Sequence, residues 1–189
     1  SIGIKSKVKQ GTNNRYPLYI PSKGRWETMF TSKYLTEMGL NHNIVVEPQE
    51  VRIYQDAVKN LSAKIIPLDM SYKDKYEYCD EHGTTISTGS GPARNFIWDH
   101  SISEGHDWHW IMDDNIKSFG IKKDGTRGRT KNKIFWTLME DYVQSYENVV
   151  MAGPNYTFFV YATKKPFHAN TRIYSCNFIK NDIPYRWRG

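Results

Sequence analysis

Three consecutive side chains that carry oxygen ligands, Asp113, Asp114 and Asn115, follow an apolar run at residues 108–112. That run predicts a buried strand, so the three side chains should emerge from a rigid strand end. Mn²⁺ and Mg²⁺ bind carboxylate and amide oxygens and leave positions open for substrate phosphates. The triplet therefore predicts a metal site that holds a diphosphate, although an Asx-rich turn that caps the next element fits a bare Asp-Asp-Asn equally well.

A glycine-rich segment lies upstream of the triplet. Gly89 and Gly91 precede Pro92, and Arg94 falls in the first turn of a helix expected at residues 92–104. Glycine amides and helix N-termini bind phosphate oxygens, and an arginine adds a forked cation. Glycine-rich loops before helices are common, so it is the combination with the acidic strand end that indicates a nucleotide diphosphate site.

Apolar runs of strand length alternate with helical periodicity in the N-terminal part of the chain. Strands are expected at residues 17–21, 43–48 and 63–68, and helices at residues 25–38 and 51–61. This alternation is typical of βαβ units and predicts an α/β protein with a mostly parallel sheet and helices on both faces. The polar residues that follow, up to the glycine-rich segment, are expected to form a long loop at the sheet edge, where ligands bind in such folds.

The remainder of the chain contains one more strong helix signal and several strand signals. The helix is predicted at residues 132–147 from apolar side chains spaced by three and four residues. A turn at residues 123–125 follows an expected strand at residues 118–122. Further strands are expected at the following residues, of which the last two could run antiparallel: 149–152, 157–162 and 171–179.

The composition is that of an ordinary globular chain. With 189 residues and 39% hydrophobic content it can bury one substantial core, which predicts a single domain at residues 16–189 after a flexible basic arm at residues 1–15. No stretch approaches the roughly 18 to 20 apolar residues of a membrane span, and the first residues lack the apolar core of a signal peptide. We therefore expect a cytoplasmic protein without a membrane partner, located in the host cytoplasm if the protein is viral.

The formal net charge of +6 favours polyanionic partners such as DNA. Several basic clusters are interleaved with Trp and Tyr, which suits phosphate contacts and base stacking. Each cluster taken alone fits a solvated surface equally well. The clusters lie at residues 5–9, 122–123, 127–133, 164–165 and 186–188.

The order of the motifs resembles that of GT-A (Rossmann-like) glycosyltransferases. The resemblance rests on a strand ending at Pro21, a second ending at Glu47, the Gly-Pro-Ala-Arg-Asn stretch from Gly91, and the Asp-Asp-Asn triplet, and it covers residues 16–189. More narrowly, the chain is similar to TET-associated, phage-type DNA glycosyltransferases, which place sugars on 5-hydroxymethyl-pyrimidines. The resemblance implies a metal-dependent, inverting hexosyl- or pentosyltransferase with a UDP-sugar as the expected donor. Its implied acceptor is bacteriophage DNA with bases such as 5-hydroxymethylcytosine.

The resemblance also implies roles for single residues on the donor side. In GT-A enzymes the nucleobase and ribose lie between the loop after the first strand and an acidic residue that ends the second. Here those positions are Pro21, Ser22, Arg25 and Glu47. The Ala-Arg-Asn stretch usually supports the nucleotide, which points to Arg94.

The metal motif of these enzymes, Asp-x-Asp, falls on Asp113, Asp114 and Asn115, with Asp113 also on the donor side. This chain departs from the pattern because its third position is Asn. The amide oxygen of Asn115 can ligate Mn²⁺ or Mg²⁺ but adds no charge, so metal affinity should be weaker or depend more on Asp114.

The general base is the part of the site for which the sequence offers no strong candidate. The resemblance places an acidic cluster just after a Tyr-Arg-Trp-Arg-like segment, and here that segment stands directly before Gly189. Two alternatives follow: either the chain is truncated at its C-terminus and the base lies beyond Gly189, or the base lies elsewhere, with Asp182 as a weak substitute. The side chains expected to contact the acceptor DNA belong to the same segment: Arg186, Trp187 and Arg188.

Two other functions stay open at this point. One is a GT-A glycosyltransferase that acts on an acceptor other than DNA. The other is a non-catalytic, nucleic-acid-binding fragment that keeps the fold without the chemistry. The sequence fixes neither the sugar and nucleotide of the donor nor the oligomeric state.

Overall fold

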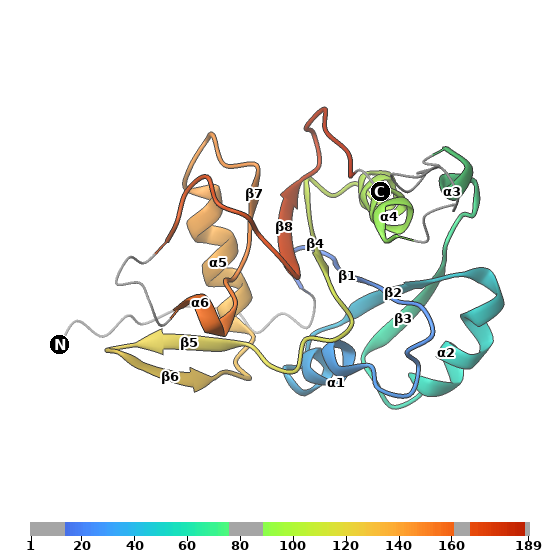
Figure 1. The fold of residues 1–189 in the computed structure, drawn as a ribbon, viewed down its shortest axis with the longest axis horizontal. Coiled ribbons are helices and arrows are strands. Elements are labelled where there is room, and N and C mark those ends of the chain that lie inside the picture. Colours follow the sequence, from blue (N-terminus) through green and yellow to red (C-terminus); the bar gives the residue numbers. More distant parts are fainter. Residues whose placement is uncertain (1–13, 76–88, 161–166, 188–189) are drawn as a thin grey trace, which may run out of the picture.

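A six-stranded sheet forms the centre of the computed structural model, which describes residues 14–75, 89–160 and 167–187 (Figure 1). From one edge to the other, its strands are β3 (Ala63–Pro67), β2 (His42–Val46), β1 (Leu18–Pro21), β4 (Trp108–Met112), β8 (Cys176–Lys180) and β7 (Met151–Ala152). The first four of these are parallel to one another, and β8 runs antiparallel to both β4 and β7. The predicted α/β architecture with a mostly parallel sheet is confirmed.

Helices cover both faces of the sheet, as predicted. One face carries α1 (Phe30–Glu37), α2 (Val51–Ala57) and α5 (Ile134–Gln144). The other face carries α4 (Gly91–Ser103), and the short helix α3 (Ser71–Lys75) lies beside α4 (Figure 1). The segment expected to be one long loop before α4 therefore contains a short helix, α3. A single 3₁₀ turn, Pro48–Glu50, precedes α2.

Side chains along each strand alternate between two buried layers. On β1, Leu18 and Ile20 join the layer under α1, α2 and α5, whereas Tyr19 joins the layer under α4. Because both faces of the sheet are buried, its strands are near-continuous apolar runs in the sequence. This is why the positions of the four parallel strands could be predicted closely.

A stack of aromatic side chains joins β4 and β8 to α5. The ring centroid of Trp110 lies 4.7 Å from that of Phe178 and 4.8 Å from that of Trp136. The indole N–H of Trp110 donates to Glu140 Oε1 at 2.8 Å. Glu140 is buried, and burial raises the pKa of its carboxyl group to about 7. The strand that leads to Asp113 is therefore held firmly in the core.

The first helix starts later than its sequence pattern predicted. Residues 25–29 lie outside α1, and Met29 has a left-handed backbone with φ of 38°. The reason is a long-range contact, because the backbone N–H of Arg25 donates to the hydroxyl of Tyr54 at 3.0 Å. Trp26 and Met29 still pack against the core, which accounts for the helical spacing of apolar residues in this segment.

The prediction of a strand at residues 157–162 was wrong, because Thr157–Val160 forms a short helix, α6. The aromatic and β-branched side chains of this segment favour a strand only where a neighbouring strand is available for pairing. Phe158 and Phe159 instead lie exposed at the surface.

A two-stranded hairpin projects from the sheet (Figure 1). It consists of β5 (Gly120–Lys123), which was predicted, and β6 (Thr126–Arg129), which was not. The predicted turn at residues 123–125 joins the two strands. β6 escaped prediction because its sequence, Thr-Arg-Gly-Arg, has no apolar alternation, and all of its residues are exposed.

Some predictions concern residues outside the described part of the chain: most of the basic arm, the basic clusters at residues 5–9 and 164–165, and Arg188 with Gly189. Within the arm, Arg15 is described and forms an ion pair with Asp141 on α5. No helix in the described residues has the length and apolar character needed to cross a membrane.

Candidate active site

Polar side chains gather at the edge of the sheet where the parallel strands end. Ser22 follows β1, Glu47 follows β2, and Asp113 and Asp114 follow β4. Ser22 Oγ donates to Asp114 Oδ2 at 2.7 Å, and the guanidinium of Arg25 lies 3.5 Å from Asp114 Oδ1. The loop after the first strand and the acidic triplet, which are distant in sequence, thus form one cluster at the edge where ligands bind in open α/β sheets.

The hydroxyl of Tyr54 forms hydrogen bonds that hold the loop after β1 in place. Its hydroxyl lies 2.8 Å from Ser22 Oγ and accepts the Arg25 backbone N–H, while its ring is fully buried. The sequence placed Tyr54 in the apolar stripe of a helix and gave no sign of this role. Pro21, the last residue of β1, is in register with Val45 of β2 and directs the chain into the same loop.

The backbone of the acidic triplet is fixed from two sides. Thr31 of α1 donates its hydroxyl to the carbonyl of Asp113 at 2.5 Å and accepts the N–H of Ile116 at 2.9 Å. On the other side, the N–H of Asp113 donates to the carbonyl of Ser175 at 2.8 Å. Thr31 is fully buried. These bonds fix the direction in which the carboxylates leave the strand, and sequence reasoning identified neither Thr31 nor Ser175.

Arg94 makes a direct ion pair with the triplet. Its Nη2 donates to Asp113 Oδ1 at 2.8 Å, its Nε donates to Ser90 Oγ at 3.0 Å, and its guanidinium lies 4.8 Å from the ring centroid of Trp187. The Arg94 side chain is 12% exposed and that of Asp113 is 36% exposed. The structure therefore brings together the first turn of α4 and the acidic strand end, with a nearly buried cation between them.

Glu47 forms a second charged group at the same edge, one strand further out. It pairs with Lys23 at 2.8 Å, pairs with Lys73 of α3, and accepts a hydrogen bond from Gln49 at 2.5 Å. Burial acts to raise the pKa of Glu47, but the hydrogen bonds from the two lysines and Gln49 outweigh it and lower the pKa to about 2. Glu47 is thus ionised at neutral pH, and its lysine partners were not recognised from the sequence.

The triplet contains oxygen ligands of the kind that hard divalent cations bind. Asp113 and Asp114 supply carboxylates from neighbouring positions, and Asn115 is exposed and supplies an amide oxygen. In the described residues, no group of three or more His, Cys, Asp or Glu side chains is placed to hold a metal. A site with two carboxylates and one amide matches the pattern in which Mg²⁺ takes few protein ligands and completes its shell with phosphate and water.

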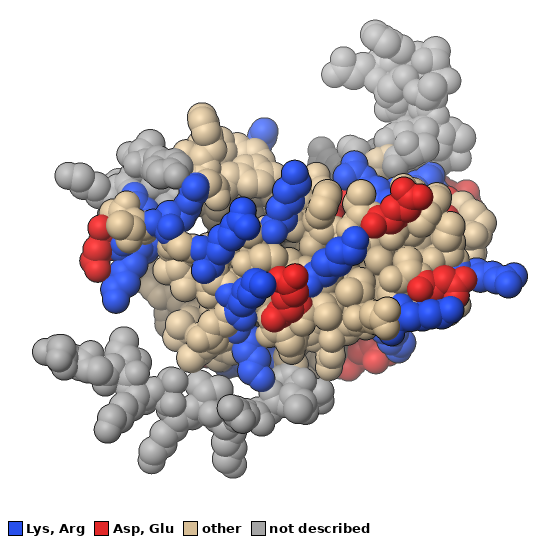
Figure 2. All heavy atoms as spheres, turned by 90° about the horizontal axis from the view of Figure 1, so that it is seen from below, with Lys and Arg blue, Asp and Glu red and all other residues tan. Residues whose placement is uncertain are grey.

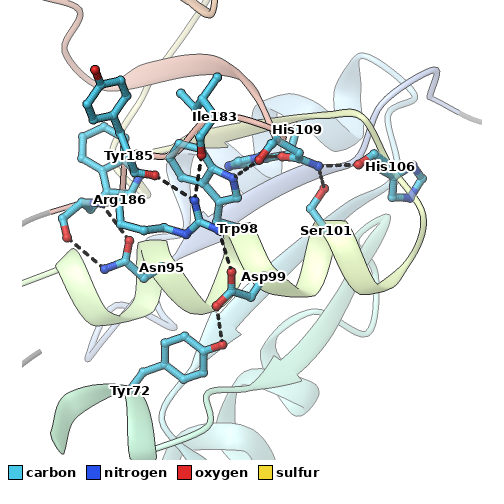
Figure 3. Close-up of polar contacts among 12 residues, drawn as sticks. Tyr72, Asn95, Trp98, Asp99, Ser101, His106, His109, Ile183, Tyr185 and Arg186 are labelled. Carbon is cyan, nitrogen blue, oxygen red and sulfur yellow. Dashed lines mark hydrogen bonds and ion pairs between the residues drawn. The ribbon is translucent and has the colours of Figure 1, made fainter. Parts of the chain in front are cut away.

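The C-terminal segment packs on α4, as Figure 3 shows. Asn95 and Trp187 exchange two hydrogen bonds, from Asn95 Nδ2 to the Trp187 carbonyl at 2.9 Å and from the Trp187 N–H to Asn95 Oδ1 at 2.8 Å. Arg186 lies over Trp98 at 4.8 Å, lies 3.3 Å from Asp99, and donates to two backbone carbonyls of its own segment. The two described residues expected to contact DNA therefore make contacts with α4, with Arg186 still exposed and Trp187 next to Arg94.

Asn181 anchors the start of this segment. Its side chain contacts His109 Nδ1 at 2.6 Å and donates to Ser101 Oγ at 3.0 Å, and its carbonyl accepts the indole N–H of Trp98 at 3.0 Å. Burial lowers the pKa of His109 to about 4, so this imidazole is neutral at physiological pH. The segment consequently begins in the core and returns along α4 toward the acidic edge.

Asp182 lies far from the triplet, although both flank neighbouring strands. β8 runs antiparallel to β4, with Lys180 opposite Trp108 and Cys176 opposite Met112. Asp182 follows β8 and therefore lies at the edge opposite Asp113. Its side chain is 71% exposed and pairs with Lys180 at 3.4 Å. The structure does not bring this carboxylate to the sheet edge at which Asp113 and Asp114 lie.

The sheet order, the helices on both faces and the polar residues at the ends of β1, β2 and β4 define a Rossmann-like α/β fold of the GT-A type. Comparison with protein-family models agrees with this class. The model of the TET-Associated Glycosyltransferase family matches residues 16–189, and the chain belongs to this family of glycosyltransferases. Neither the curated proteins nor the solved structures that were searched gave a significant match.

Proposed function

We propose that the chain transfers a sugar from a nucleotide sugar to hydroxymethylated bases in DNA, with the help of a divalent metal. The observation that carries this proposal is the cluster of Arg94, Asp113, Asp114 and Arg25 at the carboxyl edge of the sheet. Cations flank two carboxylates there, which suits a metal-bound diphosphate. Family membership supports sugar transfer, and the donor, metal and acceptor are our inference.

The reaction requires stabilisation of the leaving diphosphate. An oxygen of the acceptor hydroxymethyl group bonds to the anomeric carbon, the bond from that carbon to the diphosphate breaks, and inversion results from attack on the opposite face. Arg94, held in place by Asp113 and Trp187, faces this charge as a preorganised cation. Asp113, Asp114 and Asn115 would hold Mn²⁺ or Mg²⁺, which would supply positive charge to neutralise the diphosphate.

The nucleoside of the donor is assigned to the loop after β1 and to Glu47. Ser22 and Arg25 are fixed by Tyr54 and Asp114, which gives this loop a defined shape before a ligand arrives. Glu47 is ionised and can accept hydrogen bonds from ribose hydroxyls. The acceptor proton must go to a base that remains unassigned, because Asp182 lies at the other edge of the sheet. The proposed setting is the modification of bacteriophage DNA in the host cytoplasm, as the resemblance to phage-type enzymes implies.

A transfer assay tests the proposal. Radiolabelled UDP-sugars and other nucleotide sugars are incubated with the protein and with duplex DNA that contains 5-hydroxymethylcytosine. Label should enter the DNA when Mn²⁺ is present and should not do so after chelation with EDTA. Asp114→Asn should abolish transfer, whereas Asp56→Asn, which alters an exposed carboxylate of α2 that pairs with Lys59, should leave it unchanged.

Three results would contradict the proposal. Transfer that survives EDTA would exclude the metal, and full activity of Asp114→Asn would exclude the triplet. Equal labelling of unmodified DNA would exclude the hydroxymethyl group as the acceptor. Thermal denaturation of each variant establishes that the compared proteins are equally folded.

A further inference from the structure

Four aromatic side chains with unusually high exposure line a shallow groove beside the hairpin. They are Tyr156, Phe158, Phe159 and Tyr174, and Arg127 of β6 lines the groove with them. Phe158 is 78% exposed and Tyr174 is 39% exposed. Contiguous exposed apolar side chains on a protein surface often mark a binding site. We call these five residues the aromatic groove.

The rings of the aromatic groove are arranged for stacking. Phe159 and Tyr174 lie nearly parallel, with 16° between their planes and 5.8 Å between their centroids. Tyr156 lies 5.0 Å from Tyr174, and Phe158 lies 5.4 Å from Phe159. Flat aromatic surfaces that stay exposed can stack on nucleobases, because every base has a π-face.

The aromatic groove adjoins the candidate active site through a short path of contacts. The hydroxyl of Tyr156 bonds to Ser175 Oγ, and the carbonyl of Ser175 accepts the N–H of Asp113 at 2.8 Å. A second hollow continues from the groove toward the acidic triplet, lined by Tyr156, Ser175 and Ile116. A ligand in the aromatic groove would therefore lie close to the acidic end of β4.

The segment that contains the hairpin beside the groove is strongly basic. Residues 120–133 carry six Lys or Arg side chains and a single acidic one, Asp124. Of the six, Lys131 is paired with Glu37 at 2.7 Å. Figure 2 looks at the molecule from the side of the hairpin and α1 and shows basic side chains spread over this face. Such a surface complements the phosphates of a nucleic acid.

We propose that the aromatic groove binds the acceptor DNA, with the target base taken out of the duplex and stacked on its exposed rings, Phe158 and Tyr174 among them. The cations of the hairpin would hold the flanking phosphates. This inference rests on the proposed function, because it locates the acceptor of that reaction. Enzymes that do chemistry on a base take it out of the stack, and the exposed rings of the groove offer an extruded base a surface on which to stack.

Equilibrium binding of fluorescein-labelled DNA tests the groove without relying on turnover. Anisotropy is measured with a single strand and a duplex that each contain one 5-hydroxymethylcytosine, at fixed ionic strength. Phe158→Ala and Tyr174→Ala should each weaken binding about 5- to 100-fold, which is the range for loss of one stacked base. Tyr174→Phe keeps the ring and should retain the affinity. Tyr142→Ala removes an exposed ring on α5 and should have less than about a twofold effect.

A second measurement separates this inference from the proposed function. The thermal shift caused by UDP with Mn²⁺ reports the donor site and should be the same in the wild type, Phe158→Ala and Tyr174→Ala. DNA affinity could fall in these variants while UDP with Mn²⁺ leaves the melting temperature of every protein unchanged. That result would support the groove as a DNA site and contradict the proposed donor site.

Two results would overturn the groove as a DNA site. The first is DNA affinity that stays within twofold in both alanine variants. The second is sedimentation that shows a wild-type dimer and monomeric alanine variants with unchanged DNA affinity, because the rings would then serve self-association. Phe158 is so exposed that its replacement should not prevent folding, and circular dichroism checks this directly.

Discussion

The sheet edge that carries Asp113 and Asp114 lies beside the aromatic groove, but the two regions differ in how their side chains are buried and paired. At the edge, charged side chains are paired, and two of them are nearly buried: Arg94 is 12% exposed and bound to Asp113, and Glu47 is 8% exposed and bound to two lysines. In the groove, Phe158 and Tyr156 are exposed, and the hairpin beside them is exposed throughout. The edge is thus shaped by ion pairs before a ligand binds, whereas the groove presents exposed rings and unburied cations.

This difference suits two kinds of ligand. A small, highly charged diphosphate is best stabilised by groups that need no reorganisation when it binds. A polymer such as DNA gains affinity from many weak contacts with phosphates and bases, spread over a large surface. The following experiments test whether the two regions differ in the way this comparison predicts, from the largest expected effect to the smallest.

The largest effect is expected for Arg94→Ala. This change removes the cation that we propose faces the diphosphate, and it leaves Asp113 without its partner. We expect kcat/KM for sugar transfer to fall about 100-fold or more, in line with loss of a preorganised electrostatic contact. Arg94→Lys should recover only part of this loss, because a lysine keeps the charge but loses the fork and the stacking on Trp187. Initial rates with varied donor measure both variants.

Arg52→Ala is the matched control, since Arg52 is an exposed arginine on α2. Its kcat/KM should equal that of the wild type. An Arg94→Ala protein that retained more than half of the wild-type kcat/KM would show that the edge does not act on the diphosphate.

The second effect concerns the support of the triplet. Thr31→Val removes a buried hydroxyl that serves the Asp113 carbonyl and the Ile116 N–H. Leaving these buried groups unpaired should lower the free energy of unfolding by about 1–3 kcal/mol. Thr31→Ser keeps the hydroxyl and should lose much less. Urea denaturation measures both, and equal losses in the two variants would argue that packing of the methyl group, not the hydrogen bonds, matters here.

The third effect is a pH dependence of stability at Glu47. Its folded-state pKa of about 2 lies below the ordinary value of 4.5, so its stabilising contribution is fully present above pH 4.5 and is lost as the pH falls through 2. Glu47→Gln should therefore lower the free energy of unfolding by about 1–2 kcal/mol at pH 7, with a difference that shrinks toward pH 2. Denaturation curves of the wild type and Glu47→Gln at pH 7, 4 and 2.5 measure this difference.

Glu140→Gln provides a control of opposite sign. The pKa of Glu140 is raised by burial from 4.5 to about 7, so the folded state favours its protonated form and loses stability as the pH rises through 7. The glutamine variant should be more stable than the wild type at pH 8 and similar to it below pH 4.5. If the free energies of unfolding of Glu47→Gln and Glu140→Gln changed with pH in the same way, this assignment of charge states would be contradicted.

The smallest effect is expected in the groove region. Lys123→Ala removes one exposed cation of the hairpin. DNA binding should weaken only about two- to threefold at moderate salt, and the slope of log K against log salt concentration should decrease by about one. The thermal shift with UDP and Mn²⁺ should not change. A salt slope equal to that of the wild type would show that Lys123 does not contact phosphate.

Much of the fold could be predicted from the sequence alone. β4 and α4 were predicted almost to the residue, because a strand buried on both faces is a continuous apolar run and Pro92 suits the first turn of a helix. The exposed elements were predicted poorly. α6 and β6 lie at the surface, where no periodic apolar pattern is required.

The candidate site divides in the same way. The sequence by itself determined which side chains stand at strand and helix ends, including Asp113, Asp114 and Arg94, because local patterns locate those ends. Only the tertiary structure decided their partners: Thr31 under the triplet, Tyr54 under the loop after β1, and the pairing of Glu47 with Lys23 and Lys73. Such contacts join residues distant in sequence, and it is the folding of the chain into layers, rather than any local pattern, that brings them together.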